Sequence, residues 1–330
     1  MPDGHQRIAA MSSQSLPLVT IGMPTYNRAN GYLREALESA LAQSYPNLEI
    51  VVSDNGSTDN TESVVRSYAD PRIRFFRQQP PVTPNDNFNF CLQQANGAYF
   101  LMLHDDDKID PDFVSACMEA AGYDKRVGII RTGTRIINAV GTMIGAGRNR
   151  VAGLSMADFI LGWFAGKTPL YVCSTLYNTE GLRSMGGFHS CHNLFQDVAA
   201  TAKIAAAMGR IDIEKPMASA RRHGGKWTHV ARVREWCEDS LELLDLLCKL
   251  APDKQAEVRD RGLRFFANVN FSRANDVRAP GKRLKAYLIV YRVFGRHYFP
   301  SAGMVFRSTA LYRGLRHIKR KMLGMPAWVD

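Results

Sequence analysis

The chain has 330 residues, which is enough for one large domain or for a domain with an appended segment. Its composition, 45% hydrophobic and 22% charged, is that of a soluble globular protein, and no stretch approaches the roughly 18 apolar residues of a membrane span. The net charge of +11 is concentrated at one end, because residues 261–330 carry 15 Lys and Arg against two Asp. Residues 1–260 therefore carry a net charge of −2. This uneven distribution argues against a uniformly basic nucleic-acid binder.

The first 130 residues alternate predicted strands with predicted helices. Asp59 with Glu62 resembles a capping box, and Asp110 with Pro111 resembles an N-cap followed by a first helical residue. Strands separated by helices imply parallel crossovers, so we expect an α/β fold with a doubly wound sheet and its functional loops on one edge. Apolar runs predict strands at 18–23, 48–52, 73–76, 99–103 and 127–130. Helices are predicted to begin near residues 30, 59, 85 and 111.

Three consecutive carboxylates, Asp105, Asp106 and Asp107, follow the predicted strand at 99–103. They lie at the carboxyl end of that strand, where open α/β sheets place their ligands. Three adjacent acids repel one another unless a cation lies among them, and Mg²⁺ or Mn²⁺ carrying a diphosphate satisfies that need. The alternative is a solvated loop leading into the next helix, which accounts for Asp110 but not for the three acids.

Two further loops are expected on the same edge, at residues 24–28 after the first strand and 54–57 after the second. They supply an aromatic ring that can stack on a base, and a carboxylate that can accept from its ring N–H or from a ribose hydroxyl. Together with the acids they describe a nucleotide-diphosphate site, although an ordinary turn and an Asx turn explain each loop separately. Neither Walker A glycines nor GxGxxG occurs, so the phosphates would be held mainly through the metal.

The second half of the chain contains further predicted strands and helices. A hairpin is predicted about residues 139–141, a helix at 155–164 and a strand at 170–176. Asp197 begins a predicted helix that ends at Met208, either as a base or as an N-cap. Residues 221–229 are basic, with two glycines and one Trp, which suits either a lid or a surface loop.

The sequence strongly resembles the family 2 glycosyltransferases with the GT-A fold, through residues 19–28, 49–61 and 103–107. The resemblance extends over about residues 17–225, and it implies a GT-A type doubly wound mixed sheet flanked by helices. It also implies that Asp106, with Asp107, binds the metal of the DxD motif. His104 stands where the first acid of that motif usually is, which leaves open whether Asp105 or His104 contacts the sugar or ribose.

The resemblance also implies a base, a nucleotide-sugar site and a lid. Asp197 follows Gly186-Gly187-Phe188 at the family's spacing and is the implied catalytic base, although Gln196 replaces the first acid of the usual pair. The implied lid or acceptor residues are Arg222, His223 and Trp227, with His223 as a possible additional metal ligand. The implied nucleotide-sugar-binding residues are Pro24, Thr25, Tyr26, Arg28, Asp54, Asn85, Asn87 and Asp105.

The expected function is a metal-dependent, inverting transfer of a sugar from a nucleotide-diphosphate sugar, with UDP-sugar favoured, to a hydroxyl acceptor. The acceptor would be a glycan or a lipid-linked molecule in the synthesis of cell-surface polysaccharide or glycolipid, and the cofactor Mg²⁺ or Mn²⁺. The alternatives are an inactive nucleotide-sugar-binding protein and a sugar nucleotidyltransferase. An RNA-binding protein ranks last, because the acids would repel nucleic acid and the basic segment has no recognisable RNA-binding module.

We expect a tail at 1–16, a catalytic domain at 17–230, divided into a nucleotide-binding half (17–130) and an acceptor half (131–230), and a helical basic region at 231–330. No signal-peptide core occurs in the tail, so a cytoplasmic location is expected. Residues 281–294 and 306–323 predict basic amphipathic helices, which suits docking on an anionic membrane surface through residues 281–330. Packing of the same apolar faces on the catalytic body is the alternative.

Overall fold

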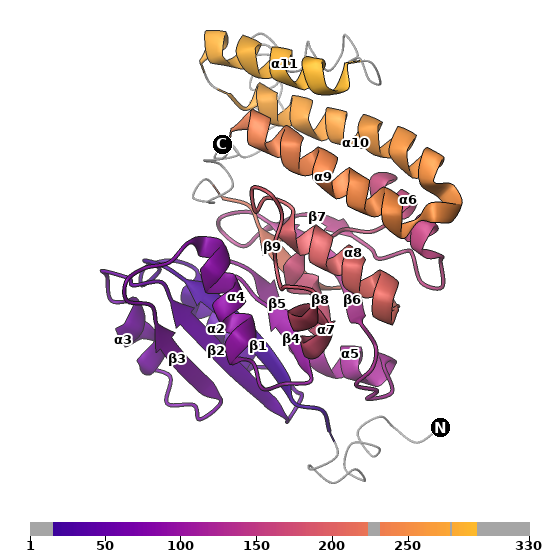
Figure 1. The fold of residues 1–330 in the computed structure, drawn as a ribbon. Coiled ribbons are helices and arrows are strands. Elements are labelled where there is room, and N and C mark those ends of the chain that lie inside the picture. The colour runs from indigo at the N-terminus through magenta and orange to yellow at the C-terminus, as the bar shows by residue number, and fades with distance from the viewer. Residues whose placement is uncertain (1–15, 224–231, 278, 296–330) are drawn as a thin grey trace, which may run out of the picture. The chain divides into compact units, whose positions relative to one another are not determined.

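The computed structural model describes residues 16–223, 232–277 and 279–295, which Figure 1 draws as ribbons. The chain divides into two compact units, one that ends at Arg222 and one that begins at His223. The described part of the first unit combines a sheet with helices, and that of the second is helical.

The first unit is built on one mixed sheet. Its strands are β1 (Val19–Thr25), β2 (Leu48–Asp54), β3 (Ile73–Arg77), β4 (Tyr99–Met102), β5 (Lys108–Ile109), β6 (Ile129–Ile137), β7 (Met143–Gly147), β8 (Thr175–Asn178) and β9 (Arg210–Arg221). Their order is β3-β2-β1-β4-β8-β6-β9-β5, with β7 paired to β6. The strands β1 to β4 are parallel, whereas β8 is antiparallel to both β4 and β6. The predicted α/β fold with a mixed sheet is therefore confirmed.

Helices cover this sheet on both faces because strand side chains point alternately to opposite sides. In β2, Ile50 and Val52 belong to one apolar cluster together with residues of α2 and α5, whereas Val51 belongs to a second cluster with residues of α4 and α8. Both clusters are buried, which leaves the loops at the strand ends to carry polar groups. The helices are α2 (Leu33–Leu41), α3 (Thr61–Arg66), α4 (Pro84–Gln94), α5 (Phe113–Ala120), α6 (Met156–Phe164), α7 (Thr179–Ser184) and α8 (Gln196–Met208).

Two of the predicted helix caps are wrong, although both helices begin within two residues of the expected positions. Asp110 does not cap α5, because its carboxylate forms a two-point ion pair with Arg135 at 2.8 and 2.9 Å, and Asp112 occupies the N-cap position. Asp59 forms no capping box for α3; its carboxylate accepts from the backbone N–H groups of Thr61 and Ala29. In both places a tertiary partner competes successfully with the local helix cap.

Strand positions in the second half of the first unit also differ from expectation. The predicted strand at 170–176 is a short 3₁₀ turn (Val172–Ser174) followed by β8. The long strand β9 was not predicted, because its sequence mixes charged residues with Pro216 and lacks a continuous apolar run. The predicted hairpin about 139–141 is confirmed as the turn between β6 and β7, where the Asn138 N–H donates to the Thr142 carbonyl at 2.9 Å.

The described part of the second unit consists of helices that pack against one another. Their bounds are α9 (Val233–Leu250), the short 3₁₀ turn η3 (Pro252–Lys254), α10 (Gln255–Asn275) and α11 (Pro280–Phe294). The buried Asn270 donates to the Ser240 hydroxyl at 2.9 Å, which joins α10 to α9. Within the described residues, no helix combines the length and apolarity that crossing a membrane requires. The helix predicted at 306–323 lies outside the described residues.

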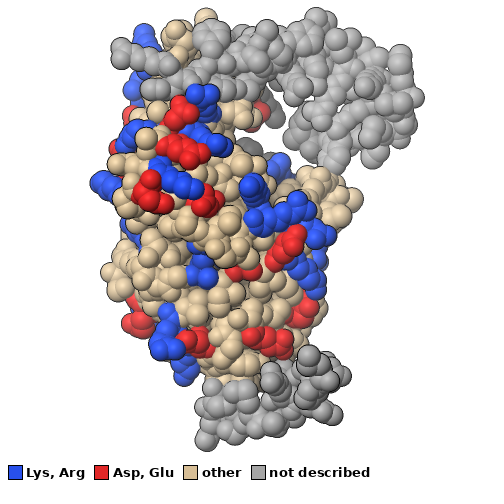
Figure 2. Space-filling view, turned by 90° about the vertical axis from the view of Figure 1, so that its right-hand side faces the viewer, with Lys and Arg blue, Asp and Glu red and all other residues tan. Residues whose placement is uncertain are grey.

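Charged side chains of both signs are interspersed on the face of the molecule in Figure 2. Ion pairs within the described residues include Arg148 and Arg150 with Glu214 at 3.3 and 3.2 Å, and Arg259 with Asp245 at 2.7 Å.

Candidate functional site

The loops after β1 and β2 meet at the carboxyl edge of the sheet, as expected for adjacent parallel strands. The Asn55 N–H donates to the Thr25 carbonyl at 2.9 Å, and the Asn27 N–H donates to the Ser57 hydroxyl at 2.8 Å. Asn27 has a φ of 52°, in the left-handed region that Asn tolerates better than most residues. These hydrogen bonds hold the two loops of the predicted nucleotide site together. The Tyr26 side chain, in the first of these loops, is half exposed.

Asp105 joins the acidic turn to the loop after β1. The Thr25 hydroxyl donates to Asp105 Oδ2 at 2.8 Å, and Arg28 Nε lies 3.5 Å from the same oxygen. Burial raises the pKa of Asp105 to about 6, while the positive charge of Arg28 acts in the opposite direction. The side chain of Asp105 therefore links the acidic turn to the loop after β1 through Thr25 and Arg28.

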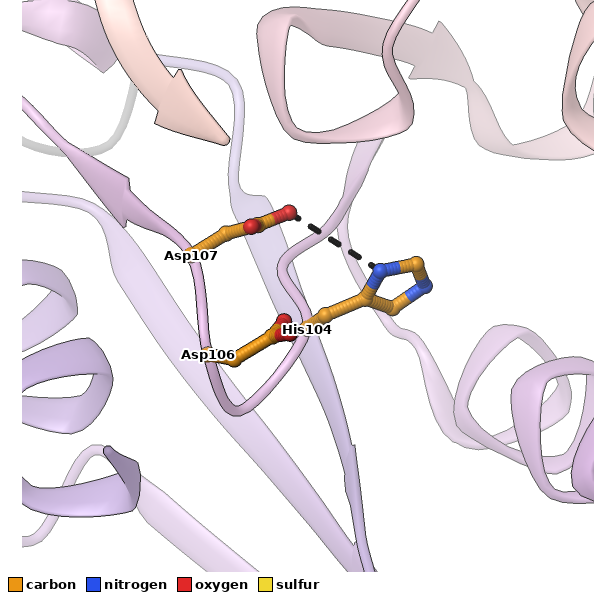
Figure 3. Close-up of side chains that lie close together, drawn as sticks. All are labelled: His104, Asp106 and Asp107. Atoms are coloured by element: carbon orange, nitrogen blue, oxygen red, sulfur yellow. Dashed lines mark ion pairs between the residues drawn. The ribbon is translucent and has the colours of Figure 1, made fainter. Parts of the chain in front are cut away.

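His104, Asp106 and Asp107 bring potential metal ligands together on this turn (Figure 3). One donor atom from each residue lies within 4.8 Å of the others, and both carboxylates are buried. Two carboxylate oxygens and an imidazole nitrogen fit a divalent cation, which would also relieve the repulsion between the acids. The donor set of the described residues is thus compatible with the metal that the sequence predicts.

Arg221, the last residue of β9, holds this turn from the side of the sheet. Its Nε donates to the Asp106 carbonyl and its backbone N–H to Asp107 Oδ1, each at 2.9 Å. Its guanidinium pairs with Glu35 at 2.9 Å and lies over the Tyr32 ring, 4.1 Å from the centroid. Burial alone would raise the pKa of Glu35, but hydrogen bonds from Arg221 and Lys108 outweigh it and lower the pKa.

Replacing Arg221 with methionine is expected to lower the free energy of unfolding by roughly 1–3 kcal/mol, because the buried Asp106 carbonyl loses its donor. The backbone N–H that binds Asp107 remains. Denaturant unfolding measures the loss, and Glu35→Gln is the matched control. It keeps an acceptor at a half-exposed position, so it should cost less. An unchanged unfolding midpoint in the Met variant would show that Arg221 does not stabilise the turn.

Three predicted nucleotide-sugar residues lie at this edge with their side chains engaged in protein hydrogen bonds. Asp54 is fully buried and accepts from the backbone N–H and the hydroxyl of Ser57. Asn87 exchanges hydrogen bonds with Ser53 at 2.6 and 3.0 Å, which joins α4 to β2. Asn85 donates to the Phe188 carbonyl at 2.9 Å, but its buried carbonyl oxygen has no hydrogen-bond partner among the described residues. Asn85 therefore retains an acceptor for a ligand hydroxyl.

The segment Gly186-Gly187-Phe188, which precedes α8 in the chain, packs against α4. Gly187 has a φ of 73°, and a Cβ atom there would lie 2.4 Å from the Asn89 side-chain oxygen, so only glycine fits. The Phe188 N–H donates to that oxygen at 2.9 Å, and the Phe188 ring is buried against Tyr177. The segment thus fixes the position of the loop that leads to Asp197.

Asp197 occupies the second position of α8 rather than its N-cap, which is Phe195. Its Oδ1 accepts from the Val198 N–H at 2.9 Å. Burial raises the pKa of Asp197, opposed by the backbone hydrogen bond from Val198 and by an electrostatic interaction with His104. The raised pKa makes this carboxylate a better proton acceptor than an ordinary aspartate.

The structure places the predicted lid residues only in part. Arg222 is exposed, and its backbone N–H donates to the Ile137 carbonyl at 2.8 Å. His223 begins the second unit, and Trp227 lies outside the described residues. The role of Arg221 was not predicted. Its sequence context places it in the basic segment 221–229, and nothing in the neighbouring residues distinguishes a buried arginine from an exposed one.

Residues 20–174 match the family model for glycosyl transferase family 2. Chondroitin synthase of Pasteurella multocida is 34% identical over 140 residues, which cover 41% of this chain and 14% of that protein. GalNAc(5)-diNAcBac-PP-undecaprenol beta-1,3-glucosyltransferase of Campylobacter jejuni is 34% identical over 160 residues, which cover 46% of this chain and 50% of that protein. The chain thus spans half or less of the length of these relatives.

Two solved structures share the fold. S. aureus TarS 1-349 in complex with UDP-GlcNAc aligns with a TM-score of 0.56 at 17% identity, covering 86% of this chain and 93% of that one. Mannosyltransferase PcManGT from Pyrobaculum calidifontis, in complex with GDP-Man and Mn²⁺, aligns with a TM-score of 0.56 at 19% identity, covering 93% of this chain and 85% of that one.

Proposed function

The chain belongs to glycosyl transferase family 2 through residues 20–174, and from this premise we propose that it transfers a sugar from a nucleotide-diphosphate sugar to an acceptor hydroxyl. The observation that carries the proposal is the meeting of three loops at one sheet edge, with His104, Asp106 and Asp107 grouped there and Asp197 electrostatically linked to them. A nucleotide binder without activity would not need a carboxylate with a raised pKa beside the metal ligands.

The proposed donor is a UDP-sugar, held with Mg²⁺ or Mn²⁺. Support comes from the bound UDP-GlcNAc of TarS and from the Mn²⁺ of PcManGT, which itself holds GDP-Man. In this chain Asp106 and Asp107 would hold the cation, and Tyr26 would stack on the base. Asp54 and Asn87 would position the loops that line the base and ribose pocket. The side-chain oxygen of Asn85, which has no hydrogen-bond partner among the described residues, would accept a hydrogen bond from a sugar hydroxyl.

In the proposed reaction, the Asp197 carboxylate takes the proton of the acceptor hydroxyl as its oxygen bonds to the anomeric carbon. The bond from that carbon to the diphosphate oxygen breaks at the same time, and its electron pair leaves with the nucleoside diphosphate. The cation, when bound, stabilises the negative charge on the leaving group. Arg28 and Arg222 add positive charge near the phosphates, and displacement from the opposite face inverts the anomeric centre.

A panel of nucleotide sugars tested with Mn²⁺ and with Mg²⁺ decides between this function and its alternatives. Transfer or slow donor hydrolysis, with release of nucleoside diphosphate, is the expected result. Release of pyrophosphate would instead identify a sugar nucleotidyltransferase. Tight binding of a nucleotide sugar without turnover under any condition would identify an inactive binding protein.

The acceptor is proposed to be a glycan or lipid-linked hydroxyl in cell-surface polysaccharide or glycolipid synthesis. Support comes from the names of the two relatives, one a chondroitin synthase and the other a glucosyltransferase acting on an undecaprenol-linked glycan. Such acceptors would bring the enzyme to a membrane surface, to which its basic helical region could bind.

Helix α11 is the proposed contact with an anionic membrane. Its side chains divide between two faces, with Ala286, Val290 and Phe294 buried. Leu284, Leu288 and Tyr291 are exposed, at 62%, 50% and 49%, and exposed Lys282, Lys285 and Arg292 lie beside them. Exposed apolar side chains flanked by cations suit a lipid interface.

Sedimentation with vesicles tests this contact. The full chain is expected to bind vesicles that contain anionic lipid, less so at high salt, and binding should fall in the double variant Leu284→Gln/Leu288→Gln. Val140→Gln, which removes an apolar side chain that is 83% exposed in the first unit, is the matched control and should bind normally. Equal recovery with neutral and anionic vesicles would contradict the proposal.

A further inference from the structure

His104 lies at the start of the acidic turn, two residues after the end of β4. The Phe88 ring packs on its imidazole with 4.9 Å between ring centroids and an angle of 35° between the ring planes. Packing against Phe88 restricts rotation of the imidazole. Figure 3 shows the Nδ1 atom of His104 directed toward Asp107. The ring is therefore presented to the carboxylates before any ligand binds.

The separation of His104 Nδ1 and Asp107 Oδ2 is 3.8 Å, which is too long for a hydrogen bond. Two ligand atoms that are each about 2.1 Å from a shared ion lie about 3.0 Å apart at a right angle and about 4.2 Å apart on opposite sides. The observed separation falls within that interval. A donor atom of Asp106 lies within 4.8 Å of both, so a small adjustment of its side chain would bring all three donors to one ion.

Arg221 fixes the carboxylate in this orientation. Asp107 Oδ1 accepts from the Arg221 N–H at 2.9 Å, which turns Oδ2 toward His104. The Asp106 carbonyl accepts from Arg221 Nε, so the backbone of the turn is also held. Ligands that are held in advance by such contacts bind metal with little rearrangement.

Within the described residues, the His104 imidazole makes no hydrogen bond. Nε2 is buried and has no hydrogen-bond partner among the described residues, and Nδ1 is too far from Asp107 to form a hydrogen bond. A neutral histidine has one donor and one acceptor to satisfy. The His104 side chain is 30% exposed, and in the tautomer that carries its hydrogen on Nε2 the Nδ1 lone pair is available to a metal ion.

We infer that Nδ1 of His104 binds the same divalent cation as Asp106 and Asp107, and that this nitrogen ligand sets the metal preference of the enzyme. The inference rests on the proposed function, since it concerns the cation of that site. Imidazole favours later transition ions, whereas carboxylates and water suit Mg²⁺. The site therefore favours Co²⁺ over Mg²⁺ more strongly than the same turn with a carboxylate at position 104.

Calorimetric titration of the full chain with CoCl₂ and MgCl₂, in the presence of UDP, tests the preference. In His104→Asp the ratio of the Mg²⁺ to the Co²⁺ dissociation constant is expected to fall by roughly 10-fold or more. His104→Asn, which adds no charge, should lose affinity for Co²⁺ more than for Mg²⁺. His189→Asn removes a histidine outside the ligand cluster and should leave the ratio unchanged. An unchanged ratio in both His104 variants would overturn the inference.

Pulsed electron paramagnetic resonance of bound Mn²⁺ gives a second readout that does not depend on turnover. Modulation from a coordinated imidazole nitrogen is expected in the wild type and in His189→Asn, and should be lost in both His104 variants. Its absence from the wild type, or its persistence without His104, would contradict the assignment. If His104→Asp instead raises only the KM for the donor, His104 contacts the sugar or ribose. Failure to transfer any sugar, with the nitrogen signal present, would count against the proposed function alone.

Discussion

Replacing Asp106 with asparagine is expected to reduce metal-dependent sugar transfer by roughly 10³-fold or more. The amide keeps the shape of the side chain but removes the negative charge that holds the cation, and with it the stabilisation of the leaving diphosphate. Initial rates of nucleoside diphosphate release with saturating donor and Mn²⁺ measure the effect. Full activity in the purified variant would remove Asp106 from the metal site.

The stability of the Asp106→Asn variant should not fall. Asp106 is one of three adjacent buried acids, so removing its charge relieves repulsion when no metal is bound. We therefore expect a midpoint of thermal unfolding equal to or above that of the wild type without added metal. The exposed Asp112, which pairs with Lys215 at 3.4 Å, provides the matched control, and Asp112→Asn should retain activity. A lower midpoint for Asp106→Asn would mean that its lost activity reflects misfolding.

Replacing Asp197 with asparagine is expected to reduce transfer by roughly 10² or more, as for the loss of a general base. Donor affinity should stay nearly unchanged, because the proposed role of Asp197 is toward the acceptor proton. Calorimetric titration with donor and an end-point transfer assay separate the two quantities. Asp158→Asn, which alters an acid in the first turn of α6, is the matched control and should leave both unchanged. Collapse of donor binding in Asp197→Asn would make this residue structural.

The pH dependence of transfer provides an independent check on Asp197. Only the ionised carboxylate accepts a proton, so kcat should fall as the pH is lowered through the pKa of Asp197. Burial raises that pKa, and the decline should therefore begin above the range of an ordinary aspartate, near pH 4. A kcat that is constant down to that ordinary range would contradict the base assignment.

The first 130 residues were largely predictable because β1 to β4 are short runs rich in apolar residues that end at a turn or a cluster of polar residues, whereas the two-residue strand β5 was not predicted. The pairing of β4 with β8 and the insertion of β9 beside β6 were not, since strand pairing depends on contacts between segments far apart in the chain. Charged residues and Pro216 interrupt the sequence of β9, so it shows no apolar run that would predict a strand. Local periodicity thus identified most of the strands and helices of the first unit, but not the order in which the later strands pair in the sheet.

The site was predictable to the extent that it follows from strand ends. Loops after adjacent parallel strands must meet, which brought residues 24–28, 54–57 and 105–107 together as expected. The inward orientation of Asp54 and Asn87 depends on partners that sequence alone does not reveal. The same holds for Arg221, which contacts Asp106 across 115 positions of the chain.

The connection between β4 and β5 has a consequence for how this protein can vary. Only residues 103–107 separate the two strands, and β4 is paired with β1 and β8 while β5 is paired with β9. Both ends of the segment are anchored, so an inserted or deleted residue would have to break strand pairing or displace every side chain in it. Homologues and engineered variants should therefore keep the fold after an exchange of residue type in this segment far more readily than after a change in its length, even where the exchange removes activity.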